Sequence, residues 1–265
     1  MYDNPRSLLD QITLLHGPHD VLGRYFVIAD AMARDCGVRL RLRTDFDALM
    51  ALNRANRTTW PPLPPICDPT HSTLTADNAF WLDGSNEHGE TVVTYFARFF
   101  DFADTNLVEA IRSLRIYYDD PAPHAAAGER VEIDAPSAAV VSGRTTYGGG
   151  MWIRRDWRGT GLPKFISRVC SAYAHTRWNT AFCWGFVVPR AHALGLSRAY
   201  GPYRAIEGLL VRLAFRGDLP TVLLWMHSEA MLADLARIVE DAAIDNPRQR
   251  YARHKSLASG TMPRQ

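Results

Sequence analysis

Apolar and polar positions alternate along the chain with two different periods. Apolar residues three and four apart predict helices, whereas strict alternation or a short continuous apolar run predicts strands. Helices are expected over residues 7–16, 20–35, 45–57, 106–117, 162–173, 189–199 and 228–241. Strands are expected over residues 38–44, 79–82, 91–100, 138–142, 145–153, 180–188, 205–215 and 221–226. The run at 180–188 is strongly apolar, as in a central strand that is buried on both faces.

Turn-forming residues sort these elements into hairpins and loops. Residues 83–90 and residues 216–218 each join two predicted strands into a hairpin. Residues 119–127 are rich in proline and alanine and are expected to form a loop. Residues 58–77 hold too many prolines for a helix or a central strand. This second loop either covers a substrate site or only connects two elements.

The order of helices and strands shows no internal repeat. Strands are mixed with helices, and hairpins occur both early and late in the chain. This order predicts an α/β or α+β domain built around one mixed sheet. A chain of 265 residues is long enough for one large domain with additions.

Composition and charge exclude several classes of protein. With 47% hydrophobic and 22% charged residues the chain is an ordinary globular one, and its net charge of +2 does not favour nucleic-acid binding. No run of 18 apolar residues or signal peptide is present, so no membrane partner is expected. The cysteines form no C-x-x-C pair, which favours reduced thiols in the cytoplasm over a disulfide or metal framework: Cys36, Cys67, Cys170 and Cys183.

The stretch from Gly148 to Cys170 carries the clearest candidate chemistry. An apolar strand ends at Ile153, a turn with two glycines follows, and helical spacing begins at Leu162. This order directs several backbone N–H groups and the positive end of a helix dipole toward one point. A pyrophosphate can bind there with little help from side chains. The three glycines at 148–150 either allow a ligand backbone to approach closely or form a bulge.

In this order of elements and in two motifs, the chain resembles the GCN5-related N-acetyltransferase (GNAT) superfamily. The run Arg158-Gly159-Thr160-Gly161-Leu162-Pro163 is similar to that family's acyl-CoA pyrophosphate loop, written Q/R-x-x-G-x-G/A. Pro163 stands where the family has a small residue, and proline suits the first position of a helix. Residues 192–201 are similar to the family's helix that ends in glycine before a strand.

The resemblance covers residues 38–226 and implies a fold and a domain organisation. The fold is a mixed, mostly antiparallel central sheet flanked by helices. An N-terminal helical extension at 1–37 precedes an acyltransferase domain at 38–245, and a polar, basic, disordered tail follows at 246–265.

The activity implied by the resemblance is direct transfer of an acyl group, first of all acetyl from acetyl-CoA, to a small-molecule or protein amine. The strand end would pair with the pantetheine arm, and the glycine turn with Lys164 would bind the pyrophosphate. The cofactor-binding residues implied in this way are Met151, Trp152, Ile153, Arg158, Gly159, Thr160, Gly161, Leu162 and Lys164.

The general base and the general acid that the family uses have no direct counterparts in this sequence. The family often uses a glutamate on the strand before the glycine turn, but no acidic residue lies between Gly143 and Arg155. Candidate bases elsewhere are His192, Glu207 and His71. The family also often uses a tyrosine to protonate the leaving thiolate, and alignment on Gly201 places Ser197 there. Tyr200 and Tyr203 lie nearby out of register, although a phenol is the better proton donor.

Two functions therefore remain open from sequence. One is an acyl-CoA-dependent N-acetyltransferase, and the other is a non-catalytic acyl-CoA-binding or interaction module on the same fold. A dinucleotide-binding protein is disfavoured, because the turn lacks G-x-G-x-x-G. The acceptor and the oligomeric state, with a homodimer as one option, stay undecided.

Overall fold

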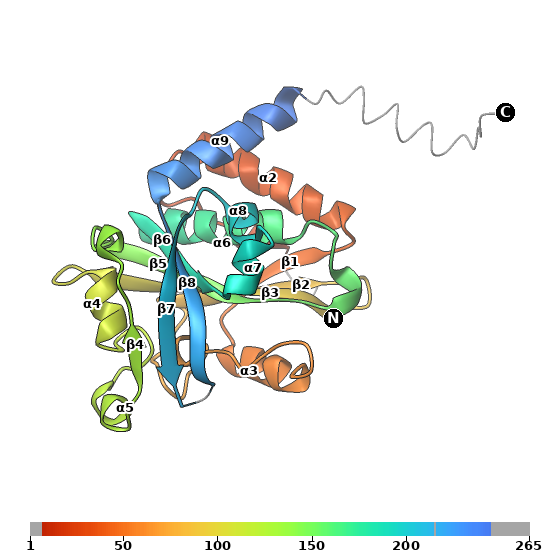
Figure 1. The fold of residues 1–265 in the computed structure, drawn as a ribbon. Coiled ribbons are helices and arrows are strands. Elements are labelled where there is room, and N and C mark those ends of the chain that lie inside the picture. Colours follow the sequence, from red (N-terminus) through yellow and green to blue (C-terminus); the bar gives the residue numbers. More distant parts are fainter. Residues whose placement is uncertain (1–6, 215, 245–265) are drawn as a thin grey trace, which may run out of the picture.

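A single eight-stranded sheet runs through the protein (Figure 1). The computed structural model describes residues 7–214 and 216–244. The spatial order of the strands is β1-β2-β3-β5-β6-β8-β7-β4. Their bounds are β1 Arg39–Arg43, β2 Ala79–Ser85, β3 Thr91–Phe102, β4 Arg130–Glu132, β5 Gly143–Ile153, β6 Phe182–Val187, β7 Arg204–Leu213 and β8 Gly217–His227.

Pairing in this sheet is antiparallel at every junction except one. Strands β5 and β6 pair in parallel, because helix α6 between them returns the chain to the end of the sheet at which β5 began. The β2–β3 and β7–β8 hairpins occur where the turn residues predict them. The expected fold class, a mixed and mostly antiparallel sheet flanked by helices, is confirmed.

Helices cover both faces of the sheet (Figure 1). On the face that we call the α6 face, α2, α6 and α9 pack over the sheet, and on the opposite α3 face lie α3 and α4. Side chains alternate along each strand, so Phe80 and Leu82 enter the core of the α6 face whereas Trp81 enters the other. The helix bounds are α1 Leu8–Gln11, α2 His19–Asp35, α3 Phe46–Ala55, α4 Leu107–Arg112, α5 Ala122–Ala126, α6 Pro163–Trp178, α7 Pro189–Ala193, α8 Leu196–Tyr200 and α9 Ser228–Ile244.

Several predicted elements differ from the observed ones. The predicted loop at 119–127 contains helix α5, and the predicted strand at 138–142 is wrong, because a 3₁₀ turn at Pro136–Ala138 stands there. Helix α4 ends at Arg112, since Leu114 adopts a φ of 61° that a helix cannot contain. The single helix expected at 189–199 is split into α7 and α8 at Gly195, whose φ is +82°.

The N-terminal helices share a core with the rest of the domain. Leu22, Tyr25 and Phe26 of α2 are buried in the same cluster as α6 and α9. The predicted tail at 246–265 lies outside the described residues.

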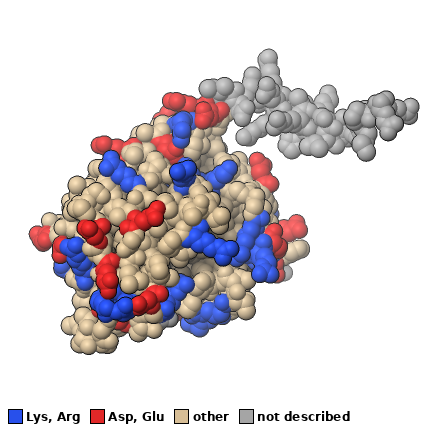
Figure 2. Space-filling model, in the orientation of Figure 1, with Lys and Arg blue, Asp and Glu red and all other residues tan. Residues whose placement is uncertain are grey.

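The surface carries mixed charges. On the face shown in Figure 2, basic and acidic side chains are interspersed among uncharged ones, in keeping with the net charge of +2. Within residues 7–214 and 216–244, no helix combines the length and the apolar character that a membrane crossing requires.

Candidate functional site

The two parallel strands β5 and β6 separate soon after they pair. Their register covers only Thr145 to Tyr147 against Phe182 to Trp184. Beyond that point β5 continues beside β3, and β6 continues beside β8. Two glycines stand where the strands diverge: a Cβ added to Gly185 would lie 2.2 Å from the carbonyl oxygen of Gly148. The strands can approach this closely only because Gly185 has no side chain, and a Cβ on Gly148 would instead meet the Tyr95 hydroxyl at 2.5 Å.

A cavity of about 290 Å³ occupies the gap between the separated strands. Its walls come from both strands, from the proline-rich loop and from α8. Among the lining residues are Trp60, Gly148, Met151, Gly185, Phe186 and Tyr200. Four residues of the loop at 58–77, from Trp60 to Leu63, line this cavity, and that the loop covers a substrate site stays a prediction.

A bulge shapes the β5 wall of the cavity. Thr94 pairs with Trp152 and Phe96 pairs with Gly149, so two β5 residues oppose the single residue Tyr95. One of the two is Gly150, whose φ of +62° is the left-handed conformation that glycine adopts in such bulges. Of the two alternatives that the sequence left for residues 148–150, the bulge is therefore present, and the close approach of a ligand backbone stays a prediction.

The edge of β5 that faces the cavity has no strand partner after Tyr147. Met151 lines the cavity, while Trp152 and Ile153 pair with β3 on the opposite edge. The Trp152 indole packs away from the α6 face, stacked on Trp60 with ring centroids 5.3 Å apart. An unpaired strand edge beside a cavity can accept an extended chain as an additional strand.

The glycine turn leads from this edge to the start of α6, as the sequence predicts. Gly159 and Gly161 have φ values of +84° and +85°, and a Cβ on either would meet nothing within 4 Å. The amide of Arg158 donates to the carbonyl of Arg155. In the part of the chain that the structure describes, the next four amides donate to no protein acceptor: Gly159, Thr160, Gly161 and Leu162. Four free N–H groups at a helix start are suited to bind a phosphate.

Basic side chains near the turn differ in how far they are neutralised. Arg154 is paired with Glu90 at 2.9 Å and with Asp156 at 2.8 Å, so it adds little net positive potential. Arg158 donates from Nε to the carbonyl of Ile153 at 3.2 Å and is exposed. Lys164 is also exposed, and no described residue pairs with its ammonium. These two cations are free to meet an anion at the turn.

Three tyrosines face the cavity from the α6 face. Tyr95 and Tyr203 each lie 3.4 Å from a serine hydroxyl of α6, Ser167 and Ser171 respectively. Tyr200 lines the cavity without a hydrogen-bond partner among the described residues. Burial raises the pKa of all three phenols, so each stays protonated at neutral pH. Tyr200 is thus the phenol free to donate a proton to a ligand.

Three of the candidate residues form a small cluster beside the cavity. The Ser197 hydroxyl lies 2.7 Å from Nδ1 of His192, and Nε2 of His192 lies 3.4 Å from a carboxylate oxygen of Glu207. Ser197 is buried, whereas 73% of the Glu207 side chain is exposed. None of the three lines the cavity. The cluster joins α7, α8 and β7, and through α8 it fixes the helix that carries Tyr200.

The remaining candidate base lies elsewhere. His71 is exposed and packs edge-on against Tyr118, with ring centroids 5.5 Å apart. It does not line the cavity, and within residues 7–214 and 216–244 no aspartate, glutamate, histidine or lysine lines it either. Among the described residues, no group of three His, Cys, Asp or Glu side chains could hold a metal ion.

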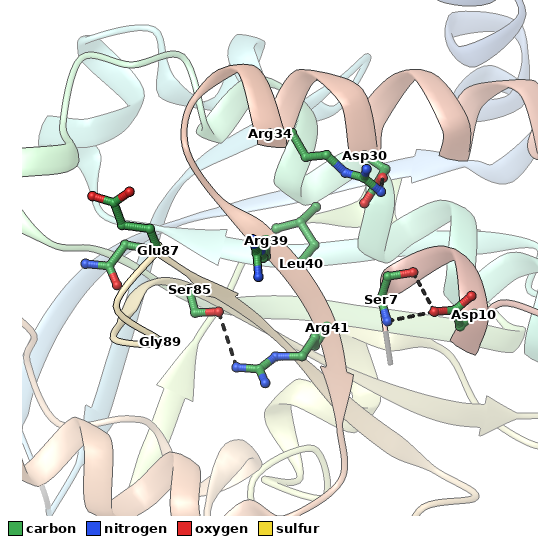
Figure 3. Close-up of a pocket in the computed structure, with 11 residues that line it drawn as sticks. Ser7, Asp10, Asp30, Arg34, Arg39, Leu40, Arg41, Ser85, Glu87 and Gly89 are labelled. Atoms are coloured by element: carbon green, nitrogen blue, oxygen red, sulfur yellow. Dashed lines mark hydrogen bonds and ion pairs between the residues drawn. The ribbon is translucent and has the colours of Figure 1, made fainter. Parts of the chain in front are cut away.

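A larger cavity, of about 470 Å³, lies at the other end of the sheet between α2 and β1 (Figure 3). Two of its arginines are engaged, since Arg34 pairs with Asp30 and Arg41 donates to Asp83 at 3.1 Å and to Ser85 at 3.2 Å, whereas Arg39 has no side-chain partner among the described residues. It touches neither the separated strands nor the glycine turn. We therefore take the smaller cavity as the candidate functional site.

Two residues that shape the cavity were not identified as site residues from the sequence. Gly185 interrupts a continuous apolar strand, and a glycine in a strand interior is a signal of close backbone approach that could have identified it. Arg216 stands in the β7–β8 turn, and nothing in the sequence relates that turn to the cavity.

Solved structures with a similar chain path are acetyltransferases and N-acyltransferases. The Arabidopsis thaliana NAA60 complex with acetyl-CoA matches at 11% identity and a TM-score of 0.44, covering 72% of this chain and 99% of that one. Aminoglycoside acetyltransferase AAC(6')-Ib matches at 14% identity and a TM-score of 0.41, covering 73% and 96%. FeeM, an N-acyl amino acid synthase from uncultured soil microbes, matches at 12% identity and a TM-score of 0.45, covering 76% and 97%.

No protein-family model and no curated protein matches the sequence. The structural likenesses are to proteins of the kind that the sequence resemblance implies, at low identity and with TM-scores below 0.5.

Proposed function

We propose that this chain is an acyl-CoA-dependent N-acyltransferase that transfers an acetyl group from acetyl-CoA to an amine. One observation carries the proposal: a cavity opens between two parallel strands that separate, beside an unpaired edge of β5. An extended pantetheine arm can bind along that edge through backbone hydrogen bonds. Its thioester then lies within the cavity, out of bulk water.

The glycine turn supports the same ligand. Four free amides and the N-terminal end of α6 offer hydrogen bonds and a positive dipole to a pyrophosphate. Arg158 and Lys164 add two exposed cations. Pro163 removes no hydrogen bond from the helix, since the first amide of a helix has no helical acceptor.

Transfer proceeds by direct attack of the amine on the thioester carbon. The C–N bond forms, the C–S bond breaks, and its electron pair leaves on sulfur. Tyr200 gives its proton to this thiolate and recovers one from water, while the nitrogen loses a proton to water. Because no carboxylate or imidazole lines the cavity, the amine enters as the free base. Ser197, His192 and Glu207 serve by holding α8.

The test is isothermal titration of the protein with acetyl-CoA, followed by assay of thiol release with a library of amines. Gly161→Trp is the binding control, because it places a bulky side chain in the turn. We expect micromolar binding by the natural chain, loss of binding in the variant, and thiol release that depends on an amine. Absence of acetyl-CoA binding to the natural chain would refute the proposal.

A second function, an acyl-CoA-binding module without catalysis, is favoured by the lack of any base in the cavity wall. It predicts binding of acetyl-CoA without amine-dependent thiol release. We place the protein in the cytoplasm, a location with which four free cysteines agree. Fractionation of cells that express the chain tests this location.

A further inference from the structure

The candidate site has a neighbouring pocket on the α3 face. A second, smaller cavity of about 140 Å³ adjoins the candidate site, and the two share Phe186, Val187, Val188 and Arg216 as walls. The glycine turn and α6 lie on the opposite face. If the acyl donor enters from the α6 face, as the proposed function requires, the smaller cavity is on the side left for the acceptor.

The walls of the smaller cavity are almost entirely apolar. Tyr147, Val211, Leu213 and Leu219 line it together with the shared residues, and no acidic side chain does. A cavity of about 150 Å³ lined by apolar side chains stays dry and binds benzene. The smaller cavity is therefore large enough for a branched aliphatic or aromatic side chain, and it offers nothing to a polycationic amine.

Arg216 is the one charged residue that lines either of the two cavities, within the described residues. It borders both, and its guanidinium has no ion-pair or hydrogen-bond partner among the described side chains. The nearby acidic residue Asp218 is instead paired with Arg212. An unpaired guanidinium at the junction of two apolar cavities is suited to a carboxylate.

We propose that the acceptor is an apolar α-amino acid. Its side chain occupies the smaller cavity, its carboxylate pairs with Arg216, and its amine faces the gap between β5 and β6. The inference rests on the proposed function and adds the substrate class to it. The reaction is the one given above, with the α-amine as nucleophile and an N-acyl amino acid as product.

The test compares L-phenylalanine with its amide, which lacks the carboxylate, and with spermidine, in acetyl transfer from acetyl-CoA. We expect kcat/KM for L-phenylalanine to exceed that for either competitor roughly tenfold or more, the effect of one charge-assisted hydrogen bond. Arg216→Gln should lower kcat/KM for L-phenylalanine about tenfold and leave phenylalaninamide unchanged. Arg190→Gln, which removes an exposed arginine of α7 that lines neither cavity, is the matched control and should change neither.

A second variant tests the smaller cavity. Leu219→Trp narrows it and should lower kcat/KM for L-phenylalanine while sparing L-alanine. Equal use of the amide or of spermidine by the natural chain would overturn the inference, as would an equal loss for acid and amide in Arg216→Gln.

Titration with L-phenylalanine distinguishes a failure of this inference from a failure of the proposed function. L-Phenylalanine is titrated into the protein saturated with coenzyme A, or into the free protein if coenzyme A does not bind. Binding that weakens about tenfold in Arg216→Gln supports the inference. If acetyl-CoA binds but no amino acid does, the substrate class is wrong and the acyl-CoA function stands. If acetyl-CoA does not bind, the proposed function fails and the acceptor role fails with it, and the titration then shows only whether the cavity binds an amino acid.

Discussion

At the scale of single residues, Tyr200 differs from the other cavity tyrosines in having an unengaged hydroxyl. Tyr95 and Tyr203 each lie against a serine of α6, whereas Tyr200 points into the cavity without a described partner. A proton donor must be able to reach the ligand, so the free hydroxyl is the better candidate.

We expect Tyr200→Phe to lower kcat about a hundredfold with little change in acetyl-CoA affinity, because general acid catalysis contributes at least this much. Steady-state thiol release and titration calorimetry measure the two quantities. Tyr203→Phe, in the same cavity, is the control and should retain most of kcat. A larger loss in the control than in Tyr200→Phe would transfer the role to Tyr203.

The expected pH dependence of kcat follows from the raised pKa of Tyr200. Burial raises its pKa above the ordinary phenol value, so the protonated form persists to higher pH than in a free tyrosine. We therefore expect kcat to show no alkaline loss from this group between roughly pH 8 and pH 10. A kcat profile over that range, with acceptor saturating at each pH, checks the sign. A fall with an apparent pKa near 9 would contradict it.

The close approach of β6 to β5 requires glycine at position 185. Its backbone lies so close to Gly148 that Gly185→Ala must push the strands apart, and we expect a loss of about 1–3 kcal/mol in the free energy of unfolding. Gly23→Ala, in α2, is the control, since its new Cβ would make an ordinary 3.6 Å contact with Leu14. The control should gain up to about 1 kcal/mol. Urea unfolding of both variants measures the difference, and an unchanged midpoint in Gly185→Ala would show that the close approach of the strands does not depend on the missing side chain.

At the scale of elements, short helices depend on side-chain links. Helices α7 and α8 have five residues each, too few to be stable without tertiary contacts. The hydrogen bond between His192 and Ser197 joins them, and it holds the helix that ends at Tyr200.

Ser197→Ala should cost about 1–2 kcal/mol of unfolding free energy, because it leaves a ring nitrogen of a half-buried histidine without its partner. It should also lower kcat without changing acetyl-CoA affinity. Glu207→Gln is the matched control, since that carboxylate is exposed, and a change within about 0.5 kcal/mol is expected. Equal stability losses in the two variants would indicate that the exposed ion pair, rather than the hydroxyl, holds the helices.

At the scale of the whole molecule, one buried ion pair ties three helices together on the α6 face. Arg168 of α6 pairs with Asp234 of α9 at 2.6 Å and donates to the carbonyl of Ala199 in α8. Both partners are largely buried, and Ala199 is the neighbour of Tyr200. The C-terminal helix therefore supports the cavity wall from a distance.

We expect Asp234→Ala to lower the free energy of unfolding by about 3 kcal/mol, since it leaves a buried guanidinium without its counter-ion. Asp20→Ala breaks the exposed pair with Arg24 and should cost less than about 0.5 kcal/mol. Chemical denaturation of the two variants provides the comparison. A loss of equal size in both would mean that burial of the pair contributes nothing.

The local signals of the sequence determined most of the elements and one half of the site. The spacing of apolar residues and the residue types in turns are properties of short segments of the chain. The two hairpins, the apolar strand β6 and the glycine turn before α6 are therefore all present as predicted. Predictions failed at 119–127 and 138–142, where short segments have no period of their own and take their conformation from the elements around them.

Only the tertiary structure decided the other half of the site. The separation of β5 from β6, the position of Glu207 beside His192, and the position of Arg216 on the cavity all depend on strand pairing. Strand pairing joins residues that are distant in the chain, and no periodicity within one segment encodes it. The sequence by itself therefore determined the glycine turn that we propose for an acyl donor's phosphates, whereas the fold determined the cavities that we propose for the thioester and the acceptor.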